Sequence, residues 1–243
     1  TDRGSGFGSA GSRSLFTAGS VIHRASEQAV ATGRELAGDV LEAAAVDIEY
    51  AEGMFRVAGT DRQIGLFDLA DRQPDRRIFI DMTSKVSGPS WPNGAHICEV
   101  ELDPETGVVQ IQSYVSANDV GRVVNPLIVR GQLDGGAVQG IGQALGEHMR
   151  YDAETGQAIT ASFMDYMMPR ADIVHGFVHV LDQSTPCLNN PLGVKGVGEL
   201  GTIGATPAVV NAVADALVRA GRSAEADRLQ MPLTPLKIWQ ALQ

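Results

Sequence analysis

Two stretches of alternating apolar and polar residues, joined by a turn, constrain the fold of this chain most strongly. Residues 94–102 and 108–117 each alternate with the period of a half-buried strand, and Asp103-Pro-Glu-Thr-Gly107 between them has the composition of a tight turn. The pattern predicts an antiparallel hairpin. Further short strands are expected at 43–50, 54–57 and 177–181.

Helices are predicted where apolar residues recur about every 3.6 positions. Stretches with this spacing or with helix-capping residues are 15–36, 64–69, 127–148, 206–220 and 236–242. Gly38 is expected to end the first helix, and Thr206-Pro207 to begin the fourth, with Thr as cap and Pro at the first helical position. We therefore expect an α+β fold with mixed or antiparallel sheets and packed helices, with two lobes, about 1–120 and 121–243, as one arrangement.

Composition excludes several classes of protein. Apolar residues make up 44% of the 243 residues and charged residues 20%, which argues against long disorder. The net charge of −10 gives no basic footprint for nucleic acid. Ile203–Leu217, the best apolar run, is interrupted by polar residues, so no membrane span is expected. Two distant cysteines, Cys98 and Cys187, are read as reduced thiols rather than a disulfide, and no secretory signal opens the chain, so we expect a cytoplasmic protein.

Glu199 is the first candidate catalytic residue. It lies in the segment 192–204, which holds five glycines and no basic residue nearer to Glu199 than Lys195. Glycines at this density indicate special backbone angles or close approach to a large ligand, and partial burial would suit a carboxylate that accepts protons. An exposed loop with an ordinary surface Glu is the alternative. The G-x-G-x-x-G within the segment is no dinucleotide motif, because no apolar strand precedes it.

Two further segments could bind a ligand. Gly11-Ser-Arg-Ser14 precedes the first long helix, where hydroxyls, N–H groups and the Arg13 guanidinium could bind a phosphate; the alternative is simple capping by Ser12 or Ser14. Gln132 lies in a glycine-rich helix and could hydrogen-bond a flat heterocycle. Tight helix packing would explain those glycines but not the glutamine. The five histidines show no metal-ligand spacing, so no protein ligand for a metal is predicted.

Together, GSRS before a helix, NPLIVRGQLDGGAVQGIGQAL and KGVGELGTIGATPAVVNAVADAL resemble the molybdenum hydroxylases, the family of xanthine dehydrogenase, aldehyde oxidase and aerobic carbon monoxide dehydrogenase. The resemblance covers nearly the whole chain but about the C-terminal third of the family's molybdopterin-binding subunit. It implies that Glu199 is the base for inserting a water-derived oxygen into an electron-poor C–H bond of an N-heterocycle or aldehyde. It also implies that Gly11, Ser12, Arg13, Ser14 and Gln132 bind molybdopterin with Mo, as the cytosine dinucleotide.

The resemblance further implies partners. Iron–sulfur clusters and FAD are expected on other subunits or domains, and the N-terminal half of the molybdenum subunit, which carries the rest of the site, is expected upstream or on a separate chain. This chain alone is then expected to hold an incomplete active site. A non-catalytic homologous binding or assembly module without cofactor is the alternative; it would need neither Glu199 nor Gln132.

Overall fold

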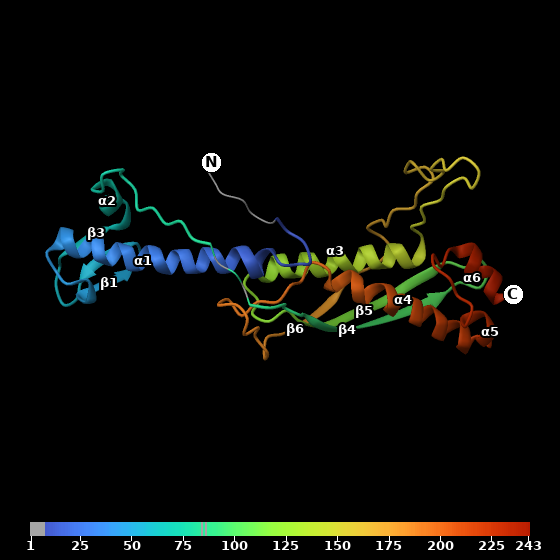
Figure 1. Ribbon diagram of the computed structural model, residues 1–243. Coiled ribbons are helices and arrows are strands. Elements are labelled where there is room, and N and C mark those ends of the chain that lie inside the picture. Colours follow the sequence, from blue (N-terminus) through green and yellow to red (C-terminus); the bar gives the residue numbers. More distant parts are fainter. Residues whose placement is uncertain (1–7, 84, 86) are drawn as a thin grey trace. The chain divides into compact units, whose positions relative to one another are not determined.

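The computed structural model describes residues 8–83, 85 and 87–243, and its contacts divide the chain into two compact units (Figure 1). Unit 1 takes in the described residues up to Ser14 together with 89–188 and 193–243; unit 2 takes in residues 15–88, apart from the two omitted, and 189–192. These units differ from lobes of about 1–120 and 121–243. A boundary near residue 120 would separate β5 (Val109–Asp119) from one of the two strands with which it pairs in unit 1.

Unit 1 is built on a three-stranded sheet with the order β4–β5–β6. β4 (Asn93–Leu102) and β5 form the predicted antiparallel hairpin. β6 (Val178–Asp182) pairs with β5 in parallel, so the chain crosses over between them, and α3 (Pro126–Leu145) lies in that connection. β6 therefore does not belong to a hairpin, and the expected α+β class with a mixed sheet is confirmed.

Two long helices, α3 and α4 (Leu200–Arg219), pack with this sheet around one core (Figure 1). β5 contributes Ile111 and Tyr114, and α4 contributes a fully buried row at four-residue spacing: Ala205, Val209, Val213 and Leu217. Among the described residues, α4 is the one helix long and apolar enough to cross a membrane, which is weak evidence for a span because this row is buried in the core. Two short helices, α5 (Ser223–Ala226) and the predicted α6 (Pro235–Leu242), follow.

Glycines let α3 and α4 approach closely. A Cβ on Gly140 would lie 2.8 Å from that of Ala205, and a Cβ on Gly201 would lie 2.6 Å from a backbone oxygen of α3. Real Cβ atoms essentially never lie at such distances, so the tight helix packing that would explain glycines in α3 is observed at Gly140. Gly131 and Gly135, also on α3, border open space.

α4 begins at Leu200, earlier than the predicted Thr206-Pro207, and that prediction is wrong. Pro207 lies inside the helix, where its missing N–H and its ring normally disfavour continuation. The preceding turns form nonetheless: the N–H of Ile203 donates to the carbonyl oxygen of Glu199 at 3.1 Å, and Gly201 packs on α3. The correction matters for function, because it places Glu199 at the N-cap of α4.

Unit 2 consists of helices packed with a small antiparallel sheet. In chain order its elements are η1 (Leu15–Gly19), α1 (Ser20–Leu41), η2 (Ala45–Asp47), β1 (Ile48–Ala51), β2 (Met54–Val57), β3 (Gln63–Gly65) and α2 (Leu66–Asp71). The predicted helix stop at Gly38 is wrong by one turn, because the helix ends only where the N–H of Ala43 returns to the Gly38 carbonyl oxygen.

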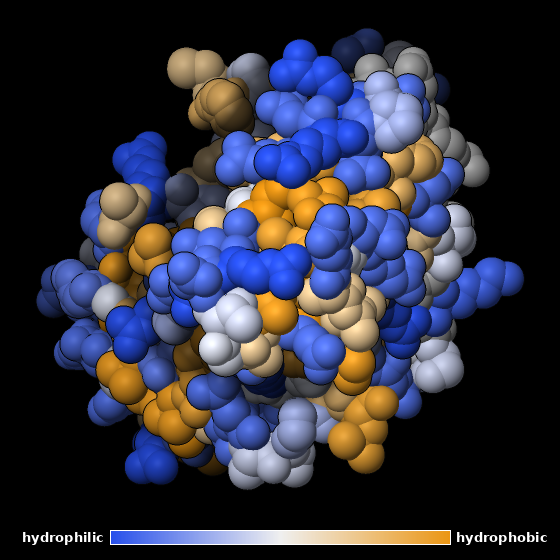
Figure 2. Space-filling model, turned by 90° about the vertical axis from the view of Figure 1, so that its left-hand side faces the viewer, coloured by the Kyte–Doolittle hydropathy of each residue, from blue (hydrophilic) through white to orange (hydrophobic). Residues whose placement is uncertain are grey.

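The core of unit 2 is formed by α1, α2 and the sheet. Phe55 of β2 is fully buried, and its ring fills the space left by Gly33 of α1. The surface that faces the viewer in Figure 2 mixes hydrophilic and hydrophobic residues. Within unit 2, Val46 and Phe67 are strongly exposed. None of the predicted catalytic or cofactor-binding residues belongs to this unit.

Candidate functional site

The loop before α4 carries Glu199 into contact with the segment 11–14, about 190 positions earlier in the chain. The hydroxyl of Ser12 donates to Oε2 of Glu199 at 2.7 Å, and the backbone N–H of Glu199 donates to the same hydroxyl oxygen at 3.0 Å. Ser12 thereby caps the first turn of α4 rather than the helix that follows it in sequence. The two segments form one site.

Gln132 of α3 reaches the same place. A Cβ built on Gly198 would lie 3.2 Å from Oγ of Ser12 and 3.5 Å from Nε2 of Gln132, so both polar groups flank this glycine. A Cβ on Gly196 would lie 2.6 Å from the backbone oxygen of Ser12. Glycine is therefore required at 196 for the two segments to touch. All three segments predicted to bind one ligand converge within unit 1.

A cavity of about 380 Å³ opens beside Glu199. Its walls come from the segment 11–14, the loop before α4, the start of β4 with the residues just before it, and the first turns of α4. They include Gly11, Ser12, Trp91, His96, Glu199 and Ile203. Glu199 itself is exposed in this chain, not partly buried as expected. Trp91 and His96 were not predicted as site residues from the sequence. The signal for them was weak: residues 88–94 are rich in glycine, proline and serine where a predicted strand begins.

His96 belongs to a polar network in the core of unit 1. Its Nδ1 lies 2.6 Å from the hydroxyl of Tyr114, and its Nε2 is buried without a hydrogen-bond partner. Burial, and then the charge of His179, lower the pKa of His96. His179 lies between Ser116 and Asp134, at 2.6 and 2.7 Å, so it is a structural histidine.

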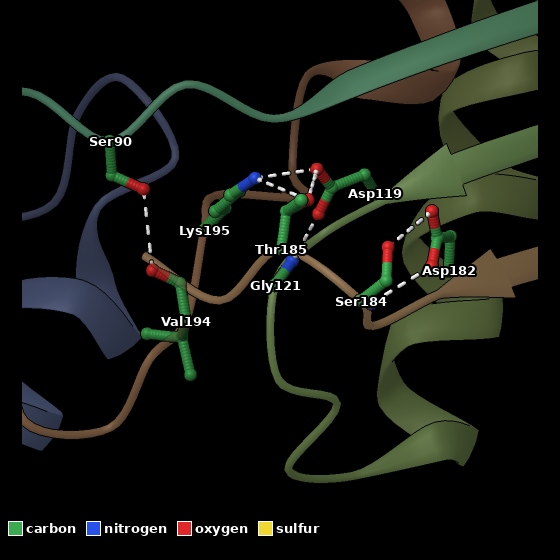
Figure 3. A network of polar contacts seen from close by, with 8 residues as sticks. All are labelled: Ser90, Asp119, Gly121, Asp182, Ser184, Thr185, Val194 and Lys195. Atoms are coloured by element: carbon green, nitrogen blue, oxygen red, sulfur yellow. Dashed lines mark hydrogen bonds and ion pairs between the residues drawn. The ribbon is translucent and has the colours of Figure 1, made fainter. Parts of the chain in front are cut away.

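Lys195 and Asp119 form an ion pair at the base of the Glu199 loop (Figure 3). The Lys195 Nζ lies 2.5 Å from Oδ2 of Asp119, and both side chains are nearly buried. Burial by itself would raise the pKa of the Asp119 carboxyl. Hydrogen bonds from Lys195, Thr185 and a backbone N–H outweigh this effect, so the pKa lies below its ordinary value. No local pattern pointed to this pair, because its partners are 76 positions apart.

The remaining predicted binding residues occupy the same segment with less defined roles. Gly11 lines the cavity and has a φ of 60°, a conformation that favours glycine. Arg13 is half-buried, and the hydroxyl of Ser14 contacts that of Ser9. Within residues 8–83, 85 and 87–243, no group of three His, Cys, Asp or Glu side chains could hold a metal ion. Both cysteines are free thiols.

Comparison with known proteins identifies the family. Residues 1–175 match the family model of the molybdopterin cofactor-binding domain, so the chain belongs to this family. The resemblance to the molybdopterin-binding subunit of molybdenum hydroxylases is thereby confirmed. A curated relative, the 6-hydroxypseudooxynicotine dehydrogenase complex subunit gamma of Paenarthrobacter nicotinovorans, is 38% identical over 98% of this chain.

Solved structures of related enzymes superpose on nearly the whole chain. The chain superposes on quinoline 2-oxidoreductase from Pseudomonas putida 86 with a TM-score of 0.80 and 32% identity, covering 100% of this chain and 31% of that one. For carbon monoxide dehydrogenase from Oligotropha carboxidovorans the TM-score is 0.82 with 30% identity, over 99% of this chain and 30% of that one. The chain also spans 30% of the length of the curated relative named above.

The residues present fit the cofactor that this family binds. Two glycines without side-chain atoms leave the Ser12 hydroxyl and the Gln132 amide at the rim of one site, and neither group is a carboxylate that would repel a phosphate. Among the described residues that line the cavity, which include Ser12, Glu199 is the one acid. Such a donor set suits a flat, anionic, hydrogen-bonding ligand.

Proposed function

We propose that this chain is part of a molybdenum-dependent hydroxylase that inserts a water-derived oxygen into an electron-poor C–H bond, with Glu199 as the base. One observation carries the proposal: the Ser12 hydroxyl lies 2.7 Å from the Glu199 carboxylate, which joins the predicted base to the predicted cofactor segment. Relatives are molybdopterin-dependent enzymes, which supports the class of reaction.

Ser12 and Gln132 would hold the molybdopterin, with Gly11, Arg13 and Ser14 at its phosphate end. The cofactor, when bound, supplies the redox centre that takes up the electrons of the oxidation. Glu199 contributes the proton acceptor: Oε2 is held by the Ser12 hydroxyl, which leaves Oε1 to take a proton from the oxygen that is inserted. The N-cap position fixes the backbone from which this carboxylate projects.

An N-heterocycle is the favoured substrate over an aldehyde, because relatives include a nicotine 6-hydroxylase and a quinoline 2-oxidoreductase. Since this chain spans about 30% of its relatives, we propose that the N-terminal part of the molybdenum subunit completes the site. Iron–sulfur and flavin subunits would carry the electrons away. The cytosine dinucleotide form of the cofactor and a cytoplasmic location belong to the same proposal.

Replacement of Glu199 by glutamine in the assembled enzyme tests the base. Glu199→Gln keeps the size of the side chain and a hydrogen bond with Ser12 but removes proton acceptance, so kcat should fall by about 10²–10⁴-fold. Molybdenum content and the thermal unfolding midpoint should stay at the parental values. Glu105→Gln, in the exposed turn between β4 and β5, is the matched control and should leave kcat unchanged.

Full activity of Glu199→Gln would refute the role of the base. The alternative, a non-catalytic assembly module, predicts that the purified complex contains neither molybdenum nor pterin. The convergence of Ser12, Gln132 and Glu199 on one place counts against that alternative, because a module without cofactor has no need of it.

A further inference from the structure

We propose that Lys195 and Asp119 act together as positioning residues for Glu199, by fixing the loop 193–199 to the end of β5. The inference rests on the proposed role of Glu199 as base. Among the described residues, neither forms a hydrogen bond or ion pair with Glu199: Lys195 lies near the opposite end of the loop, and Asp119 lies at the end of β5. They would act by setting where the loop enters the site.

The ion pair is held from several directions. Oδ2 of Asp119 accepts from Lys195 Nζ at 2.5 Å and from the hydroxyl of Thr185 at 2.7 Å, while Oδ1 accepts from the backbone N–H of Gly121 at 2.8 Å. Figure 3 shows Lys195 reaching from the loop across to Asp119, with Thr185 beside them. The exposed fractions of the two charged side chains are 11% and 14%, so water screens their attraction little.

The backbone around the pair is also joined to β5 and its continuation. The Lys195 N–H donates to the carbonyl oxygen of Val120 at 2.8 Å, and the Arg122 N–H donates to the carbonyl oxygen of Gly193 at 2.9 Å. Gly121 has a φ of 63°, and a Cβ there would overlap the Gly193 oxygen. Gly121 and Val194 thus form a short antiparallel backbone bridge, and the Lys195–Asp119 ion pair lies beside it.

A second acid makes the lysine charge necessary. Asp182 of β6 is the register partner of Asp119 of β5, so two carboxylates stand side by side at the ends of parallel strands. Lys195 lies within hydrogen-bond distance of Asp119, and, besides the hydrogen bonds from Ser184, its charge also lowers the pKa of the Asp182 carboxyl. Removing its charge would leave a nearly buried carboxylate beside a like charge, which is strongly unfavourable and would drive the local structure apart.

Glu199 is then fixed from both sides. Lys195 anchors the chain four residues before it, and α4 begins one residue after it. Between the two anchors, Gly196 packs on Ser12, and Val197 packs, partly buried, against the hydrophobic cluster that contains Leu200. Loss of the first anchor would let the Glu199 carboxylate shift relative to the cofactor segment. A misplacement of about 1 Å can cost about 10²-fold in rate.

The test uses Lys195→Met, Asp119→Asn and the double variant in the assembled enzyme. We expect kcat to fall about 10–100-fold in Lys195→Met while KM changes less than about threefold, because the groups that contact substrate are retained. In the double variant the loss should match that of the larger single effect rather than the product of the two, since residues that act as a unit are non-additive. Arg219→Met, which breaks the exposed Arg219–Asp215 pair on α4, is the control for loss of an ion pair.

Hydrogen exchange gives a readout that does not depend on activity. In Lys195→Met, amides at 196–199 should exchange faster while those of the buried row of α4 keep the parental rates. Exchange that rises equally along α4, parental kcat in Lys195→Met, or losses that multiply in the double variant would each overturn the proposal. Glu199→Gln measured in the same series separates the two ideas: if its activity is full, the base assignment fails, while the exchange pattern still decides whether the pair fixes the loop.

Discussion

On the side of α3 that faces α4, Gly136 and Gly140 have no side chains, so the backbone of α4 can pack directly against that of α3. By contrast, Gly131 and Gly135 of α3 border open space. Close packing explains the first pair, since a side chain there would collide with α4. It does not explain the second pair, because a helix gains stability from alanine at exposed interior positions.

Gln132 belongs with the open pair. Its side chain is exposed and its amide lies beside Gly198. Gln132 shares this part of α3 with Gly131 and Gly135, where no atom of the described residues lies within 4 Å of a Cβ built on either glycine. The difference between the two pairs of glycines shows that one residue type can have two roles in the same helix. Where glycine meets backbone it permits packing, and where it meets nothing it leaves room that a ligand can use.

The largest effect is expected where α4 meets α3. Gly201→Ala would place a Cβ 2.6 Å from one backbone atom of α3 and 2.8 Å from another, and neither helix can yield without the other. Overpacking of this kind costs about 1–3 kcal/mol, so we expect the free energy of unfolding to fall by about 2 kcal/mol. Urea unfolding measures it. An unchanged midpoint would mean that the helices are not in close contact.

The second prediction concerns the open face. Gln132→Leu keeps the volume of the side chain but removes its hydrogen bonds, each worth about 0.5–1.5 kcal/mol, so cofactor retention should fall about 3–10-fold in the assembled enzyme. The free energy of unfolding of the protein without cofactor should not fall, because the side chain is exposed. Pterin content after dialysis measures retention. Parental retention would remove Gln132 from the cofactor site.

Part of this arrangement could be predicted from sequence and part could not. Local composition marked Glu199, Ser12 and Gln132 only as candidates, with an ordinary surface Glu and simple helix capping as alternatives, and the resemblance to the molybdenum hydroxylases assigned all three to one site. The start of α4 was misplaced because Pro207 resembles a first helical residue, and the packing of Gly201 on α3 overrides that local preference. The Lys195–Asp119 pair has no local signature at all.

A third prediction concerns the imidazole ring of His96, which packs against α4. Gly204 of α4 leaves room for the His96 ring, whose burial, and then the charge of His179, lower its pKa below the ordinary 6.5. The unfolded chain therefore binds a proton more readily than the folded one, so stability falls as the pH drops below about 6.5. The free energy of unfolding at pH 7.5 and 5.5 should show this slope, and His96→Gln should flatten it. Equal slopes in both proteins would exclude His96 as the cause.

The smallest expected effect has the opposite sign. In Gly135→Ala the new methyl group meets no atom within 4 Å, and alanine is about 0.8–1.0 kcal/mol better than glycine in a helix interior. The protein without cofactor should therefore gain up to about 1 kcal/mol in free energy of unfolding, whereas Gly201→Ala loses stability. Position 135 is three residues after Gln132 and lies near it on the helix surface, so the methyl group should also lower cofactor retention if that space is used. Gain of stability together with loss of retention would show that this glycine is kept for a ligand; loss of stability would mean that the face is covered within the protein and that the two pairs of glycines do not differ.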